Sequence, residues 1–186
     1  MKWFLPLFAL LATPLFAAEW DVPARAGAIS ETLSRAQPGD TLRLAPGTFA
    51  ETVVLDFPIV LDGAGEAIID GGGVGTVITV NGDDVTLRGL TVIGSGSDHS
   101  ELDSGIKLTK TASNPVVINN VLQGNLYGVD IHGATDALVA DNVIEGRQDL
   151  HMNDRGNGVY LWSAPGAVVE RNDIRWGRDG IFVFLR

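Results

Sequence analysis

Four residues in two short segments are the first candidates for a binding surface. Asp130 and His132 lie in "GVDIH", and Tyr160 and Trp162 lie in "GVYLW". Both segments alternate with aliphatic residues, so in β-strands these side chains share one face. Exposed aromatic rings mark surfaces that bind sugars or protein partners. We therefore predict a partner- or ligand-binding face made of Asp130, His132, Tyr160 and Trp162.

The polar segment "GRQDLHMNDRGN" (residues 146–157) bears on this face in two ways. If it folds over the aromatic rings, they are packing residues and no binding face exists. The segment also contains His151 and Met152, whose side chains suit copper, close to Asp149 and Asp154. We expect weak or transient copper binding at His151 and Met152. The alternative is a solvated polar loop without a metal.

Signals for catalysis are weak. Asp62 and Asp70 lie in "DGAGEAIIDGGG", but Asp-Gly pairs are first of all typical of turns. Two carboxylates on adjacent strands could carry acid–base chemistry on a glycan. No serine stands in a recognisable nucleophile motif, and the chain contains no cysteine. The sequence predicts no catalytic residue.

The elements that position these residues repeat along the chain. Gly105, Gly128, Gly158 and Gly180 each open a short apolar run, at separations of 23, 30 and 22 residues. A second marker keeps the same step: Asn120, Asn142 and Asn172 are 22 and 30 residues apart. Such periods indicate stacked repeats. The runs are rich in Val and Ile, and no helical segment separates them, so we predict an all-β fold, a parallel β-helix.

In this solenoid the glycine-led strands stack from coil to coil. We expect one apolar inward column, with Ile181 and Val183 as its last members. The three asparagines are expected at a bend, where they hydrogen-bond between coils and adopt the left-handed conformation. The segment "AGAISETLSRAQPGD" differs, because Ile29 and Leu33 are four residues apart. It predicts a short helix that caps the first coil.

Composition sets the outer limits. The 186 residues fit one domain, and the net charge of −10 argues against a nucleic-acid partner. Lys2, an apolar stretch and Ala17-Ala18 predict a signal peptide over residues 1–18, with a membrane anchor as the alternative. We therefore expect export to the periplasm and a β-helix domain over residues 19–186.

Several longer motifs carry a family resemblance. "GDTLRLAPGTF", "AIIDGGGVGTVITV", "GNLYGVDIHGA" and "GNGVYLWSAPGAVVERNDIRWGRDGIFV" are similar to the NosD family of periplasmic maturation factors of nitrous oxide reductase. The resemblance covers the whole chain after residue 18. It implies a right-handed parallel β-helix and a non-catalytic role. It also implies that the protein works with an ABC transporter to assemble the copper–sulfur centre of the reductase, with a copper carrier as a further partner.

Two other expectations accompany the resemblance. The chain stops after "GIFVFLR", whereas the helix of the family continues, so we expect the domain to be incomplete at its C-terminus. An apolar last strand also predicts self-association through that edge. The alternative function is a carbohydrate-binding protein, or an enzyme that cleaves or epimerises polysaccharides, on the same fold.

Overall fold

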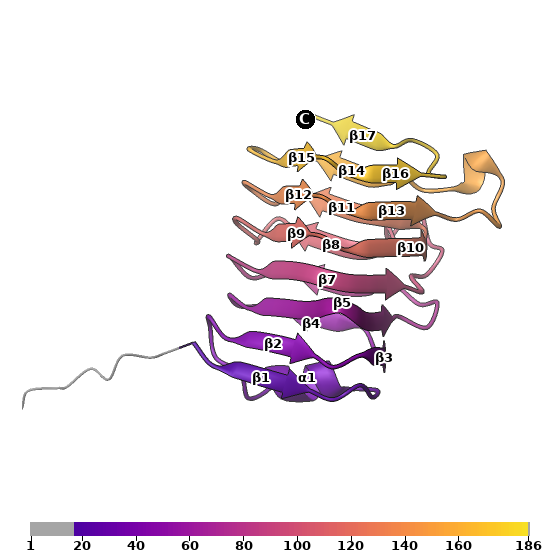
Figure 1. Cartoon of the computed structure of the whole chain (residues 1–186). Coiled ribbons are helices and arrows are strands. Elements are labelled where there is room, and N and C mark those ends of the chain that lie inside the picture. The colour runs from indigo at the N-terminus through magenta and orange to yellow at the C-terminus, as the bar shows by residue number, and fades with distance from the viewer. Residues whose placement is uncertain (1–16, 186) are drawn as a thin grey trace, which may run out of the picture.

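The chain folds into a solenoid of short strands, which Figure 1 shows as coils stacked from β1 to β17. The computed structural model describes residues 17–185. The strands are β1 (Glu19–Val22), β2 (Thr41–Leu44), β3 (Gly47–Ala50), β4 (Val53–Leu55), β5 (Val60–Asp70), β6 (Ile78–Val80), β7 (Thr86–Ile93), β8 (Ser104–Thr109), β9 (Val116–Ile118), β10 (Val121–Asn125), β11 (Tyr127–His132), β12 (Leu138–Ala140), β13 (Val143–Gly146), β14 (Val159–Trp162), β15 (Val168–Glu170), β16 (Asp173–Arg175) and β17 (Ile181–Phe184).

All pairings between these strands are parallel, and they form two sheets. The six-stranded sheet has the order β17-β14-β11-β8-β6-β4, so each strand pairs with its counterpart in the next coil. The other sheet has eleven strands. The predicted all-β fold, a right-handed parallel β-helix, is confirmed.

The glycine-led strands stack as predicted. Ile106, Val129, Val159 and Ile181 occupy one register position on β8, β11, β14 and β17. The first three are fully buried, whereas Ile181 is 48% exposed. Val183 is likewise 54% exposed, so the expectation that both join the buried column is wrong. They keep the register, but no described residue packs a further coil over them.

The asparagine ladder is confirmed, with one correction. The Oδ1 atom of Asn142 accepts from the backbone N–H of Asn120 at 3.0 Å, and Asn172 Oδ1 does the same for Asn142. Each asparagine therefore satisfies a buried backbone group of the neighbouring coil. The left-handed conformation, however, belongs to the preceding residue in each coil. These residues are Asn119, Asp141 and Arg171.

A short helix covers the first coil, as predicted. Helix α1 (Ala28–Leu33) lies beside β1 at the lower end of the solenoid in Figure 1 and buries Ile29 completely. The Glu51 carboxylate accepts hydrogen bonds from the N–H groups of Ile29 and Ser30, both at 3.0 Å, and so satisfies the helix N-terminus. Among residues 17–185 no helix is long and apolar enough to cross a membrane. The predicted signal peptide lies almost wholly outside the described residues.

Candidate functional site

The structure brings the four predicted face residues together on adjacent strands. Asp130 pairs with Tyr160, and His132 pairs with Trp162, between β11 and β14. One coil earlier, the corresponding residues on β8 are Lys107 and Thr109. The side chains therefore form two parallel rows that run along the solenoid axis, since strands in one sheet keep side chains on a common face.

The aromatic rings of these rows stack on one another. The imidazole of His132 lies parallel to the indole of Trp162, with centroids 4.5 Å apart and planes 18° apart. In the other row, the rings of Tyr160 and Phe182 are 5.6 Å apart and 4° from parallel. Stacking of this kind stabilises the coil-to-coil packing. Tyr160 and Trp162 are consequently only partly exposed, which corrects the expectation of free aromatic rings.

Asp130 was expected on the surface, but its side chain is fully buried. Both carboxylate oxygens lack a hydrogen-bond partner among the described residues. The nearest nitrogen atoms of basic side chains are Lys107 Nζ and His132 Nδ1, each 3.6 Å from one of those oxygens. Burial raises the pKa of Asp130 to about 7, and the charge of Lys107 opposes this rise only partly.

His132 and Lys107 are the basic side chains that lie beside the buried Asp130 carboxylate. Burial and the positive charge of Lys107 both lower the pKa of His132, so its imidazole is neutral at pH 7. Lys107 Nζ donates to the carbonyl oxygen of Glu101 at 2.7 Å, which holds the ammonium group beside the buried carboxylate. The two side chains thus separate Asp130 from solvent.

An open groove of about 440 Å³ lies on this face. It is lined by Lys107, Thr109, Lys110, His132 and Trp162. Of the predicted face residues, only His132 and Trp162 line it. The sequence did not lead us to predict Lys107 and Lys110 as site residues, although the rarity of lysine in this chain makes two lysines close together a recognisable signal. The chain has three lysines, and these are two of them.

The polar segment 146–157 does not contribute to the groove. Arg147 donates to Ser97 Oγ at 3.1 Å, and His99 Nε2 lies 3.0 Å from the carbonyl oxygen of Asp154. None of its residues lines the groove, so it does not cover Trp162 there. His151 and Met152 are both exposed, at the start of a single 3₁₀ turn (Met152–Asp154).

The described part of the chain contains no group of three or more His, Cys, Asp or Glu residues that could hold a metal. His151 Nδ1 instead accepts a hydrogen bond from the Asn153 N–H at 3.4 Å. The thioether of Met152 and the imidazole of His151 supply two ligand types that suit copper, but no further ligand converges on them. The donor set therefore fits a transient contact with copper better than a closed site.

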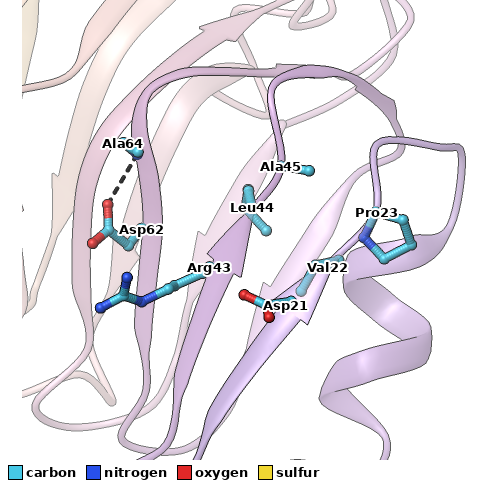
Figure 2. Close-up of a pocket in the computed structure, with 8 residues that line it drawn as sticks. All are labelled: Asp21, Val22, Pro23, Arg43, Leu44, Ala45, Asp62 and Ala64. Atoms are coloured by element: carbon cyan, nitrogen blue, oxygen red, sulfur yellow. Dashed lines mark hydrogen bonds between the residues drawn. The ribbon is translucent and has the colours of Figure 1, made fainter.

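A second hollow, of about 420 Å³, lies between β1, β2 and β5 near the capped end (Figure 2). Two of its three charged groups, Asp62 and Arg43, already have partners. Asp62 accepts hydrogen bonds from the Ala64 N–H at 2.9 Å and from Arg88 at 2.7 Å, while Arg43 pairs with Glu19. Burial raises the pKa of Asp62, but these bonds and the charge of Arg88 lower it further, below its ordinary value. We assign no function to this hollow.

Fold and groove together define a right-handed parallel β-helix protein with a cationic and aromatic patch on one sheet. No protein-family model matches the chain. It is similar to the "Probable ABC transporter binding protein NosD" of Pseudomonas aeruginosa, with 35% identity over 175 residues, which are 94% of this chain and 40% of that protein. The protein of the same name from Stutzerimonas stutzeri is 32% identical over 138 residues, which are 74% of this chain and 32% of the relative.

The resemblance to NosD predicted from the sequence motifs is confirmed by these two relatives. The chain spans about two fifths and one third of their lengths. Among solved structures, an alginate lyase from Paenibacillus sp. superposes with a TM-score of 0.63 and 21% identity, over 89% of this chain and 64% of the lyase. The PL6 family alginate lyase AlyGC gives 0.57 and 16%, over 85% and 26%. At these identities the likeness concerns the fold alone.

Proposed function

We propose that this chain is part of an accessory protein that associates with an ABC transporter and serves the maturation of nitrous oxide reductase. The observation that carries the proposal is the similarity to two proteins named for ABC transporter binding, continuous over 94% of the chain in one of them. The role is non-catalytic. In support of this, the carboxylate of the candidate face, Asp130, is buried rather than presented to a substrate.

The proposed site of action is the periplasm, where the copper–sulfur centre of the reductase is assembled. The partners are the transporter subunits, the reductase and a copper carrier. We propose the sheet face with His132, Tyr160 and Trp162 as the docking surface, since stacked rings hold a rigid shape at little entropic cost. His151 and Met152, both exposed on the inserted loop, are proposed as transient copper contacts during transfer.

Co-purification tests this proposal. A tagged chain is recovered from cells that contain the transporter, the reductase and the copper carrier, and its partners are identified by mass spectrometry. We expect Trp162→Ala to reduce partner recovery several-fold. The matched control is Trp176→Ala, because Trp176 is 42% exposed and lies outside this face.

The stability of both variants is measured alongside. Trp162 stacks on His132, so we expect its replacement by alanine to lower the unfolding free energy by about 1 kcal/mol. The variant should therefore remain folded during purification at low temperature. If the unaltered chain recovers none of these partners above the level of an unrelated β-helix protein, the proposal is wrong. If partners bind and Trp162→Ala leaves their recovery unchanged, the docking surface lies elsewhere.

A further inference from the structure

The groove on the six-stranded sheet holds cationic charge that the rest of the described surface does not. Within residues 17–185 every arginine except Arg155 forms an ion pair with a carboxylate, and Arg155 donates to backbone carbonyls. Lys110 has no acidic partner there, whereas Lys107 Nζ forms an ion pair at 3.6 Å with the buried carboxylate of Asp130. On a chain of net charge −10, both described lysines line one groove.

The groove also has a shape that admits a ring. One register row consists of Thr109, His132, Trp162 and Phe184 on four successive coils. The last three carry rings, whereas Thr109 is small. Trp162 covers one face of the His132 imidazole, at 4.5 Å. Towards the other face the row offers only Thr109, which leaves a notch where the next ring of the stack would lie.

The Thr109 hydroxyl, which lines the groove, belongs to a small hydrogen-bonded cluster. Thr109 Oγ1 lies 3.0 Å from Thr111 Oγ1 and 2.9 Å from Asn81 Oδ1. Thr111 Oγ1 in turn donates to the carbonyl oxygen of Asn81 at 2.9 Å. Because Thr109 Oγ1 donates its proton within the chain, a ligand hydroxyl that reaches it donates to its free lone pairs. An isolated carboxylate would use only the two lysines.

We propose that this groove binds an acidic sugar, a uronate residue, at the notch above Thr109. The carboxylate pairs with Lys107 and Lys110, the apolar face of the sugar ring lies on the imidazole of His132, and a hydroxyl donates to Thr109 Oγ1. Ammonium groups suit a carboxylate as point charges. About 440 Å³ is ample for one sugar ring and admits a neighbouring one. This function goes beyond the transporter-associated role and does not depend on it.

Isothermal titration calorimetry with trigalacturonate tests the proposal on the chain without its first 18 residues. The neutral trisaccharide maltotriose and the acidic peptide triglutamate serve as comparison ligands. We expect trigalacturonate to bind, and both comparison ligands to bind at least about tenfold more weakly, since one lacks the carboxylates and the other the sugar ring.

Two variants separate charge from shape. Lys110→Ala, at an exposed and unpaired lysine, should weaken trigalacturonate binding about tenfold. Thr109→Phe continues the ring row by one coil and fills the notch while both lysines remain, so it should abolish sugar binding. Arg175→Ala removes an exposed cation from the other sheet and should change nothing. Melting temperatures establish that each variant is folded.

Three results would overturn the proposal. The first is that trigalacturonate does not bind the unaltered chain. The second is that Lys110→Ala binds it as tightly as the unaltered chain does, which keeps the test decisive even if Thr109→Phe fails to fold. The third is that triglutamate binds as tightly as trigalacturonate, which would make the groove a docking point for an acidic protein segment.

Discussion

At the scale of single residues, Asp130 is the most unusual group on the candidate face. Its carboxylate is fully buried, both oxygens lack hydrogen bonds among the described residues, and its pKa is raised to about 7. Because the pKa is higher in the folded chain, the protonated form is the one that folding favours. Charging Asp130 therefore costs stability, a cost that is absent below about pH 4 and complete above about pH 7.

We expect Asp130→Asn to remove this cost while keeping the size of the side chain. The shift from 3.8 to about 7, which already includes the opposing effect of Lys107, corresponds to at most about 4 kcal/mol. The difference in unfolding free energy, variant minus unaltered chain, should rise between pH 5 and pH 8. Urea unfolding at both values measures it, and other carboxylates cancel in the difference. A difference that stays constant with pH would mean that Asp130 is charged throughout.

The sequence predicted where these side chains lie along the chain, but not how deep they lie. Alternation places Asp130 and Tyr160 on the outward side of their strands, and the observed register agrees. How deeply a side chain is buried depends on which neighbouring side chains fold over it. Alternation indicates only which side of a strand a residue faces, so it does not predict that Lys107 and His132 cover Asp130. The prediction of an exposed Asp130 was wrong for this reason. The lysines of the groove were missed because they lie on an earlier coil than the aromatic motif.

At the scale of the strand elements, the glycines that open β8, β11 and β14 have a steric role. A Cβ atom on Gly128 would collide with the carbonyl oxygen of Gly158 and with the Ile144 side chain. Gly158 meets Ile174 and the Gly180 carbonyl in the same way. The coils therefore approach one another closely at the glycine column. Gly180 itself has no atom within 4 Å of its Cβ position.

This contrast gives a matched pair of substitutions. Gly128→Ala should lower the unfolding free energy by about 1–3 kcal/mol, because the backbone carbonyl it meets cannot move aside freely. Gly180→Ala should change it by less than about 0.5 kcal/mol. Urea denaturation of both variants measures the difference. Equal effects would mean that the glycines serve another purpose than close approach.

The repeat markers predicted the strands because both arise from contacts that recur in every coil. Glycine marks the close approach, and asparagine marks the side chain that bonds to the next coil. The bend was assigned less well, since the left-handed position falls on Asn119, Asp141 and Arg171. Asn119 and Asp141 are residue types that tolerate this conformation, but Arg171 is not, so residue type alone does not single out the position. Backbone geometry alone sets that position.

At the scale of the whole molecule, the two ends of the six-stranded sheet differ. At the β17 end, Ile181, Val183, Phe184 and Leu185 are between 41% and 79% exposed. Strand β17 pairs with β14 on one side, and no described strand pairs with its other side. An apolar strand with a free edge is a template for another chain.

We expect the chain of this sequence to self-associate through β17. Val183→Lys places a charge on that apolar end and should reduce association. Val54→Lys is the matched control, because Val54 on β4 is 52% exposed, close to the 54% of Val183, and lies at the opposite end of the same sheet. Analytical ultracentrifugation over a concentration series measures both. A monomer at every concentration, or an equal effect of the two variants, would contradict the expectation.

The scarcity of lysine has a practical consequence for labelling chemistry. Reagents that acylate primary amines react with lysine side chains and with the chain terminus. Of the three lysines one is Lys2, and the other two, Lys107 and Lys110, line the groove. On a chain that starts after residue 18, such a reagent would mark one surface patch and one terminus. Amine-directed cross-linking therefore probes the neighbours of this patch directly, without any engineered attachment point.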